Sequence, residues 1–407
     1  MAATLVRFAG ATQLEQTLEI RVLISTFTFP PDNNGVANAA FTHARILKQL
    51  GCRVEVLTFG EHQSRGEVDG LDLVRFPVRG QGHPLSPSRG AVAELRRFLT
   101  EGRWDVVFTH CWQAWNTNEV LEFFVNAVRL EKIVLVSHGL STESNSYPFP
   151  FNFARRIIWW PYRTSRVPRY LRRLDLLVHL WNHEDRDRFL DLAIARELSV
   201  PVSIVPNVAR YDGCHVSRPA LSLTYGNLAG GFMLCVGNYS NNKNEAFVLE
   251  AYRMSGMKHI PLIFVGNKRN SYSEMLEKKA REWGLDRVEF CTGLTKEEID
   301  WLYREASLFL LGSRTECQPM VVLDALASGT PCISTDVGCV SALGCVSIVD
   351  SPEAMASQIR LQMSNTALRC ELAERGVVFA NQEFSLAAST AKWRNVLTTL
   401  SLPTLTK

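Results

Sequence analysis

Two carboxylates, Glu316 and Asp324, lie eight positions apart around the start of a predicted helix. The apolar run 308–311 before them predicts a buried strand. Pro319 lies between them and suits the first position of a helix, because no N–H partner is needed there. The free N–H groups at a helix start readily bind anions. The segment therefore predicts an anion site with one carboxylate just before the helix and a second within it.

The rest of this segment predicts how the helix ends. Met320, Leu323 and Ala327 give it an apolar face, and Gly329 follows as a C-terminal stop. A second apolar run, 331–334, predicts the next strand. The whole unit is therefore expected to read strand, polar turn, helix and strand.

Three further polar groups each follow a predicted strand. The loop 30–35 precedes the first long helix, and His138 comes directly after an apolar run. Lys243 lies near the start of another helix, where a lysine can pair with phosphate charge. Each pattern also has a plain structural interpretation: an ordinary turn, a histidine bonded to the backbone, and a solvated surface lysine.

Both halves of the chain alternate apolar strands with amphipathic helices. Strands are expected at 21–27, 53–57, 71–76, 105–109, 133–137, 176–180 and 202–205, and then at 232–236, 261–265, 288–291, 308–311 and 332–334. Helices are expected at 35–50 and 243–254 and between the later strands. This alternation is typical of parallel sheets covered by helices on both faces. We therefore predict an α/β protein with two doubly wound, Rossmann-like domains.

A polar stretch at 210–230, rich in Gly and Ser, predicts the domain boundary. We assign residues 1–215 to an N-terminal domain and 216–385 to a C-terminal domain. The segment 386–407 is expected to form a helix that packs back on the first domain. Doubly wound sheets bind ligands at the carboxyl ends of their strands, so the site is expected in the cleft between the domains.

Composition bears on the class of protein. The net charge of the 407 residues is +3, which gives no argument for nucleic-acid binding. Ten cysteines without a C-x-x-C pair favour reduced thiols in a cytoplasmic protein over a disulfide framework. The N-terminal segment lacks the apolar core of a signal peptide, and no apolar run is long enough to span a membrane. We expect a cytoplasmic protein whose membrane contact, if any, is peripheral.

The order of these groups resembles a known family. The spacing of Glu316 and Asp324, followed by the run 329–331, is similar to the signature of the family 4 glycosyltransferases, and the resemblance extends over 21–382. Supporting matches are Pro31 with Gly35, His138-Gly139, Pro206-Asn207, Gly266, Phe290 with Gly293-Leu294, and Gly237 with Lys243. The resemblance implies the GT-B fold, with acceptor binding by the N-terminal domain 1–215 and nucleotide-sugar binding by the C-terminal domain 216–385. It also implies a sugar-nucleotide donor and retaining transfer without a metal ion or other cofactor.

The resemblance also implies roles for individual residues. Lys243 would hold the donor diphosphate, and Glu316 and His138 would face the transferred sugar. Asp324 would accept hydrogen bonds from the ribose hydroxyls. Further donor contacts are implied for Gly35, Gly293, Leu294, Cys317, Gln318, Pro319, Met320, Val321 and Val322. The departing phosphate could itself take the acceptor proton, so no strong protein base is expected.

Two positions depart from the family pattern. Asn238 stands where most members carry Arg, so one positive charge near the diphosphate is missing. A nearby arginine could replace it, or donor binding could be weaker. Asp324 replaces the usual Glu and is one methylene shorter, but it keeps the carboxylate. Because Lys243 and Glu316 are both present, we expect an active enzyme.

Residues 155–173 contain seven arginines, interleaved aromatics and no acid. The residues of this stretch that are expected to contact an acceptor or a membrane are Arg155, Arg156, Trp159, Trp160, Arg163 and Arg166. Aromatic rings suit a membrane interface and arginines suit anionic head groups, so we predict a peripheral membrane patch or a site for a phosphate-linked lipid acceptor. A solvated basic face is the plain alternative. Trp112, with Trp115 and Asn116, could add a sugar-stacking surface, although core packing would explain a tryptophan equally well.

The functional hypothesis is therefore a retaining glycosyltransferase that moves a sugar from a nucleotide diphosphate to a glycan. The expected acceptor is lipid-linked or part of a surface glycan such as lipopolysaccharide, O-antigen or exopolysaccharide. One rival is a nucleotide-sugar epimerase of related fold, which would change its sugar nucleotide without an acceptor. The other is a non-catalytic partner in a glycan-assembly complex, which would bind a sugar nucleotide without turnover. No nucleic-acid partner is expected.

Overall fold

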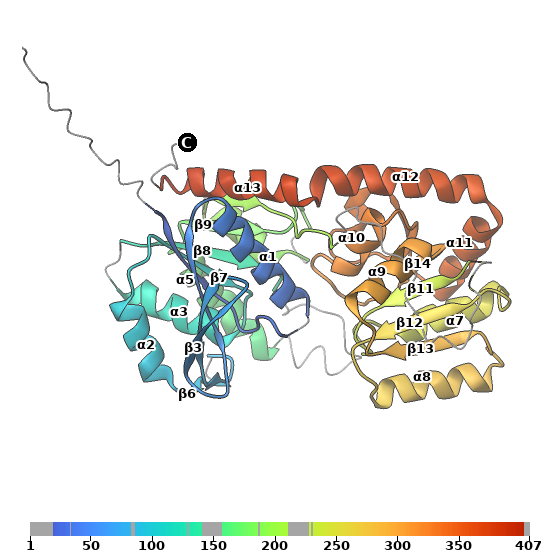
Figure 1. The fold of residues 1–407 in the computed structure, drawn as a ribbon, viewed down its shortest axis with the longest axis horizontal. Coiled ribbons are helices and arrows are strands. Elements are labelled where there is room, and N and C mark those ends of the chain that lie inside the picture. The colour runs from blue at the N-terminus through green and yellow to red at the C-terminus, as the bar shows by residue number, and fades with distance from the viewer. Residues whose placement is uncertain are drawn as a thin grey trace, which may run out of the picture.

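The computed structural model describes residues 19–402, except 33, 83–85, 128–129, 141–156, 186–187, 211–227 and 229–230. These residues form two α/β domains, each built around a sheet that is largely or wholly parallel. In Figure 1 the N-terminal domain lies at the left and the C-terminal domain at the right, and two long helices run along the top of both. The predicted fold class, two doubly wound Rossmann-like domains in the GT-B arrangement, is confirmed.

The sheet of the N-terminal domain has the strand order β10-β9-β8-β7-β1-β2-β4-β3 in the described residues. Its strands are β1 Arg21–Ser25, β2 Arg53–Phe59, β3 Ser64–Val68, β4 Leu71–Phe76, β7 Val106–His110, β8 Lys132–Ser137, β9 Leu176–His179 and β10 Val202–Ile204. All neighbours pair in parallel except β3, which runs antiparallel to β4 at the edge. The short strands β5 Val78–Arg79 and β6 Arg89–Gly90 form a separate pair.

The sheet of the C-terminal domain is parallel, with the strand order β13-β12-β11-β14-β15-β16. Its strands are β11 Met233–Val236, β12 Leu262–Gly266, β13 Val288–Thr292, β14 Leu308–Leu311, β15 Cys332–Thr335 and β16 Val346–Val349. Central β11 lies between β12 and β14, so the order reverses there. Ligands of doubly wound sheets bind at such a reversal.

Helices cover both faces of each sheet (Figure 1). In the first domain they are α1 Gly35–Gln49, α2 Val92–Glu101, α3 Trp115–Asn126, the π-helical turn η1 Tyr162–Arg166, α5 Val167–Leu171 and α6 Leu190–Glu197. The later helices are α7 Glu245–Ser255, α8 Ser271–Glu282, α9 Lys296–Glu305, α10 Met320–Ala327, the 3-10 turn η2 Val340–Leu343, α11 Pro352–Ser364, α12 Thr366–Glu383 and α13 Leu386–Thr399.

All the expected strands are present, and their ends differ from the expected ones by at most two residues. The expectation was incomplete at β3, β16 and the pair of β5 and β6. Strand β3 reads Ser-Arg-Gly-Glu-Val and is exposed over its first four residues. It therefore lacks the apolar pattern by which a strand is recognised in a sequence.

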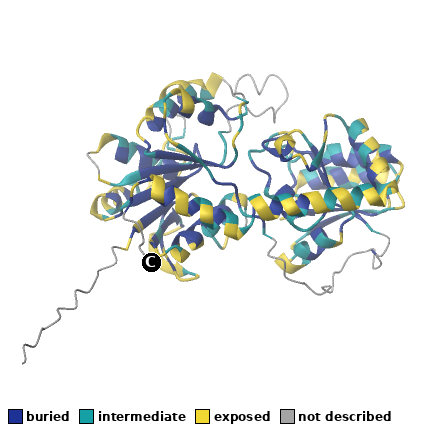
Figure 2. Cartoon of the chain, turned by 90° about the horizontal axis from the view of Figure 1, so that it is seen from above, coloured by how far each residue is buried: buried dark blue, intermediate teal, exposed yellow. Residues whose placement is uncertain are grey.

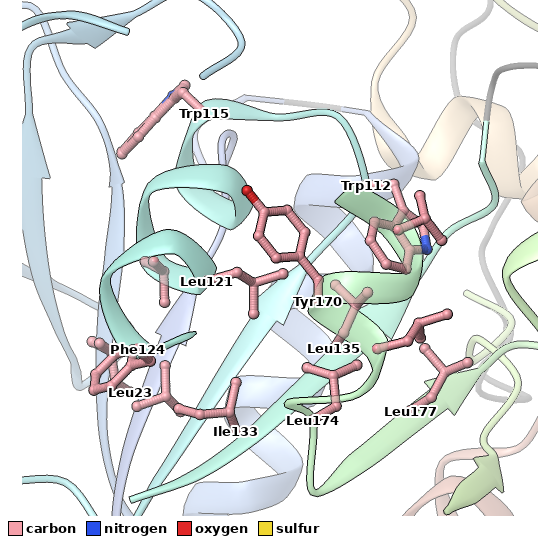
Figure 3. Close-up of a cluster of buried hydrophobic side chains, with 14 of the residues drawn as sticks. Leu23, Trp112, Trp115, Leu121, Phe124, Ile133, Leu135, Tyr170, Leu174 and Leu177 are labelled. Atoms are coloured by element: carbon pink, nitrogen blue, oxygen red, sulfur yellow. The ribbon is translucent and has the colours of Figure 1, made fainter. Parts of the chain in front are cut away.

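Alternating side chains of β1 show how the first sheet divides the core. Leu23 packs into a cluster on one face, and Val22 and Ile24 pack into a cluster on the other, because successive strand residues point to opposite faces. Figure 3 shows the first cluster, in which Trp112, Trp115 and Tyr170 gather over the sheet. Figure 2 shows that the strands are buried and that the outer faces of the helices are exposed.

The chain returns to the first domain after completing the second. Helix α12 lies on the C-terminal domain, and α13 then runs back over α1 of the N-terminal domain (Figure 1). The Trp393 side chain of α13 is fully buried and packs in the same cluster as Val22 and Ile24. The two domains are therefore tied together by the C-terminal helix as well as by the segment after β10.

Candidate active site

A cavity of about 630 Å³ opens between the domains at the carboxyl ends of both sheets. The N-terminal domain lines it from the start of α1 and the end of β8, and the C-terminal domain lines it from the loops after β11, β12, β13 and β14. The predicted residues that line it are Gly35, His138, Asn238, Lys243, Gly293, Leu294, Glu316, Cys317, Gln318, Met320, Val321 and Asp324. The structure thus brings residues from both domains to one cleft.

Lys243 and Glu316 form an ion pair at this cavity. The Nζ atom of Lys243 lies 2.6 Å from Oε1 of Glu316, and the hydroxyl of Ser313 donates to the same oxygen at 3.0 Å. Both side chains are largely but not fully buried, with 26% and 15% exposed for lysine and glutamate. The pair forms because β11 and β14 are neighbours in the sheet, so the loops that follow them meet.

Two helix starts face each other across the cleft. A Cβ atom built on Gly35, the first residue of α1, would lie 3.8 Å from Cγ of Met320, the first residue of α10. Asn34 caps α1 by accepting the N–H of Ala37. Each helix start carries partial positive charge and unsatisfied N–H groups. Their approach from two domains therefore creates a local excess of positive potential at the cavity.

The expectation at the start of α10 needs two corrections. Pro319 is not the first helical residue but the N-cap, with ψ of 105°, because extended backbone is what lets the chain turn into the helix. The N–H of Val322 is not available to a ligand, since it donates to the carbonyl of Pro319 at 3.0 Å. The N–H groups of Met320 and Val321 therefore remain as the ones that could face an anion, and both residues line the cavity.

The predicted end of α10 is confirmed. The helix ends at Ala327, and Gly329 follows with φ of +76°, a conformation that glycine adopts without strain. The N–H groups of Gly329 and Thr330 donate back to the carbonyls of Leu326 and Ala325. This bonding pattern satisfies the last carbonyls of the helix.

Asp324 is almost fully buried at the floor of the cleft. Its Oδ1 accepts the backbone N–H of Arg210 at 2.7 Å, which ties α10 to the segment that connects the domains. Burial raises the pKa of Asp324 from 3.8 to about 7, although the Arg210 N–H and guanidinium oppose the rise. A carboxyl with such a pKa is present in both forms at neutral pH and can accept or donate a hydrogen bond.

The loop that carries Cys317 and Gln318 also joins the domains. The side-chain oxygen of Gln318 accepts a hydrogen bond from the N–H of Asn207 at 2.7 Å, and its amide nitrogen donates to the carbonyl of Leu180. Gln318 therefore links the two domains through two hydrogen bonds. Gly139 has φ of +94°, and a Cβ there would lie 2.9 Å from Cβ of Cys317. Only a glycine therefore allows this approach beside the cleft.

His138 lines the cavity from the N-terminal domain. Its Nε2 lies 3.2 Å from Nδ1 of His110, the last residue of β7. Burial, with a contribution from His179, lowers the pKa of His138 to about 4. The imidazole at the cleft is therefore neutral at pH 7.

Trp112 does not form the predicted stacking surface. The side chain is buried, and its Nε1 donates to Oδ2 of Asp191 at 2.7 Å. Trp115 is buried as well, and the amide of Asn116 donates to the carbonyls of Ser25 and His110. These residues build the wall behind the cleft, because the indole N–H of Trp112 and the amide N–H groups of Asn116 bond to the first domain itself.

The basic aromatic stretch lies on the first domain, outside the cavity lining. Arg155 and Arg156 lie outside the described residues. Trp159 packs on Tyr162, with ring centroids 5.5 Å apart, whereas Trp160 is 63% exposed. Arg163 is half-buried, and Arg166 donates to the carbonyl of Gly82 at 2.7 Å. The stretch therefore has an inner side that packs and an outer side that faces solvent.

Several cavity residues were not predicted. Asn38, Arg210 and Asn267 line the cavity. Arg210 is the most informative, because it adds a second lining cation to Lys243 where Asn238 offers none. The signal in the sequence that could have pointed to Arg210 was its position at the start of the polar stretch 210–230 between the expected domains. In the described part of the chain, no cluster of three or more metal-ligand side chains is present, and no helix is long and apolar enough to cross a membrane.

Two protein-family descriptions match the chain, one for each domain. Residues 34–197 match the "Glycosyl transferase 4-like domain", and residues 231–365 match "Glycosyl transferases group 1". Among curated proteins, mannosylfructose-phosphate synthase of Agrobacterium fabrum is 28% identical over 115 residues. That match covers 26% of this chain and 25% of the relative.

Solved structures match over nearly the whole chain. Sucrose-phosphate synthase from Thermosynechococcus elongatus has a TM-score of 0.71 at 15% identity, covering 94% of this chain and 99% of that one. HepE from Anabaena in complex with UDP-glucose has a TM-score of 0.65 at 15% identity, covering 94% and 100%. The α,α-trehalose 6-phosphate synthase from Burkholderia multivorans has a TM-score of 0.69 at 12% identity, covering 94% and 98%. At these identities the likeness establishes the fold.

Proposed function

Since the chain belongs to the family 4 glycosyltransferases of GT-B fold, we propose that it transfers a sugar from a nucleoside diphosphate to a glycan acceptor with retention of anomeric configuration. The observation that carries the donor assignment is the meeting of two helix starts, at Gly35 and Met320, beside the Lys243 side chain. These groups leave positive potential that a diphosphate would neutralise.

The remaining lining suits the other parts of such a donor. Asp324 lies at the floor of the cavity, where its carboxyl could bond a ribose, and Gly293 and Leu294 could border the base. Arg210 offers a cation that could partly replace the arginine missing at Asn238. One neighbour of this fold, HepE from Anabaena, has been crystallised with UDP, with UDP and glucose, and with UDP-glucose, which supports a nucleoside diphosphate donor.

The chemistry follows from this placement. As the sugar–phosphate bond breaks, negative charge develops on the departing diphosphate, and Lys243 with the N–H groups of Met320 and Val321 would stabilise it. The acceptor hydroxyl attacks from the same face and gives its proton to the departing phosphate oxygen. Glu316 and neutral His138 would orient the sugar hydroxyls. These steps assign no role to a metal ion.

The outer side of the basic aromatic stretch suggests the class of acceptor. Ile157, Ile158 and Trp160 lie within one short helical turn and are 58%, 51% and 63% exposed. Arg172 and Arg173, further along the same stretch, are exposed as well. Apolar side chains next to arginines suit an anionic lipid surface. We propose a lipid-linked glycan acceptor, met by peripheral binding on the cytoplasmic face of the membrane.

A donor screen followed by product analysis tests the function. The correct sugar nucleotide should raise the unfolding temperature, since a ligand at a hundredfold excess over its Kd adds about 2.7 kcal/mol of stability. With an acceptor present, NMR should then show a product whose anomeric configuration equals that of the donor, also in the presence of EDTA. An inverted product would refute retention. Conversion of the sugar nucleotide without acceptor would indicate an epimerase, and binding without turnover a non-catalytic partner.

Vesicle binding tests the acceptor side. The variant I158S/W160S should bind phosphatidylglycerol-containing vesicles several-fold more weakly than the wild type in a sedimentation assay, because two exposed apolar anchors are lost. The matched control is V378S, which removes an apolar side chain that is 56% exposed on α12. Equal vesicle binding of all three proteins would contradict the membrane proposal.

A further inference from the structure

A column of four buried or half-buried rings runs from the cleft to the C-terminal helix. His138 at the cavity stacks near His110 with ring centroids 5.4 Å apart, and His110 lies 5.4 Å from His43 of α1. His43 in turn lies 4.7 Å from Trp393 of α13. His110, His43 and Trp393 are fully buried. The cleft histidine is therefore backed by two further histidines that the proposed chemistry does not use.

Side-chain hydrogen bonds fix the backbone around His110. Its carbonyl accepts hydrogen bonds from the side chains of Asn116 and Thr117 at the start of α3. Immediately afterwards, Cys111 and Gln113 have φ of +69° and +60°. Left-handed backbone at a residue other than glycine is strained, and such strain clusters at functional sites. The chain thus tolerates strain while it fixes the ring of His110 behind the cleft.

The contact between the two rings can hold only one proton. In a neutral histidine one ring nitrogen carries the proton and the other accepts. Burial is the main cause that lowers the pKa of His138, of His110 and of His43, the last to about 3, so the column is neutral at pH 7. His110 Nδ1 must therefore either donate to His138 Nε2 or accept from it.

The buried side of His110 distinguishes these two arrangements. Its Nε2 has no hydrogen-bond partner among the described residues. If His110 accepted from His138, the proton of His110 would lie on Nε2 as a buried donor without an acceptor, and orphaned N–H groups are the rarer defect in proteins. If His110 instead donates from Nδ1, its Nε2 is a bare acceptor. The second arrangement leaves the proton of His138 on Nδ1, the nitrogen left for the cleft.

We propose that His110 is a positioning residue that holds His138 in the Nδ1–H tautomer, so that the cleft receives a neutral N–H donor. Within the proposed function, on which this role rests, the donor would bond a hydroxyl oxygen of the transferred sugar. The groups near the column are His43, His179 and Asp191, and His179 Nε2 lies 3.8 Å from Asp191 Oδ1. None of these replaces the contact between His110 and His138.

NMR of the full chain labelled with ¹⁵N-histidine tests the tautomer directly. The His138 signals are assigned from the spectrum of H138Q, and long-range ¹H–¹⁵N couplings report which nitrogen carries the proton. We expect Nδ1–H in the wild type at pH 7.5. In H110F an aromatic ring is kept but the donor is lost, so His138 should change to the Nε2–H form that histidine prefers in water. Nε2–H in the wild type, or an unchanged tautomer in folded H110F, would overturn the proposal.

Two further variants separate hydrogen bonding from packing. In H110N the amide can donate from near the former Nδ1 position, so the Nδ1–H tautomer should be retained. H43F keeps an aromatic ring between Trp393 and His110 and leaves the contact of His110 with His138 untouched, so tautomer and activity should equal those of the wild type. Loss of the tautomer in H43F, or in folded H110N, would count against the proposal.

Steady-state kinetics test whether the positioning of His138 by His110 matters for transfer. In H110F kcat should fall about 10- to 100-fold, as expected when a contacting group is displaced or misdirected, while KM for the donor changes less. H110N should recover most of the lost kcat. An unchanged kcat in H110F would refute the positioning role. Because the NMR result does not depend on turnover, absence of any transfer by the wild type would refute the proposed function without touching the tautomer assignment.

Discussion

Replacement of Lys243 by alanine is expected to lower kcat/KM about 10²- to 10³-fold, the usual effect of losing one preorganised donor at a developing charge. Two effects combine in this variant. The departing diphosphate loses the charge of Lys243. Glu316 loses its partner at 2.6 Å and, among the described residues, keeps the hydroxyl bond from Ser313. The uncompensated carboxylate would then repel the diphosphate. Steady-state kinetics with the identified donor, together with calorimetric titration of the nucleoside diphosphate, measure both effects.

The matched control is K278A on α8, which removes an exposed lysine at the surface of the same domain. It should leave both measurements unchanged. The double variant K243A/E316Q should bind the nucleoside diphosphate more tightly than K243A, because the repelling charge is gone. The coupling between the two sites is read from the double-mutant cycle. Wild-type turnover by K243A would remove Lys243 from the proposed mechanism.

The second large effect is expected for Glu316→Gln. The substitution keeps the size of the side chain and one acceptor oxygen, but it removes the charge that Lys243 pairs with. Transfer should fall about 10- to 100-fold, because hydrogen bonds from sugar hydroxyls to a charged acceptor are the stronger ones. Binding of the nucleoside diphosphate should be kept or strengthened, since the freed lysine can turn fully to the phosphates. The expected signature is therefore a lower kcat without a higher KM.

E305Q serves as the control, because Glu305 is an exposed residue at the end of α9 in the same domain. Its kinetics should match those of the wild type. If E316Q transferred sugar at the wild-type rate, the sugar-contacting role would be refuted. If it lost nucleoside diphosphate binding instead, Glu316 would be a structural partner of Lys243 rather than a contact of the sugar.

The candidate segment was predictable because its signals are local. The apolar run of β14, the glycine after α10 and the spacing of the two carboxylates all act within one strand, turn and helix. The ion pair of Lys243 with Glu316 joins residues 73 positions apart. It depends on β11 lying beside β14, and strand order leaves no mark on local periodicity. The hydrogen bond between Gln318 and Asn207 could not be predicted for the same reason.

The interior of the first domain was predicted less well. A tryptophan after a strand reads the same whether it lines a cleft or fills a core, and for Trp112 the choice depends on Asp191, which is 79 positions away. Likewise, nothing near His110 in the sequence indicates that its ring touches His138. The exposed edge strand β3 was missed because only its pairing with β4 makes it a strand. Long-range contacts therefore account for most of the differences between expectation and structure.

The return of α13 to the first domain has a consequence for how the protein is made. Trp393, Val396 and Leu397 fill the same apolar cluster as Val22 and Ile24 of β1. A ribosome releases the N-terminal domain first, yet this domain lacks part of its core until α13, which follows the whole second domain in the sequence, has been synthesised. While the second domain is translated, the first domain therefore exposes an apolar face over β1 and α1. Docking of α13 on the first domain can therefore occur only after the second domain has been synthesised.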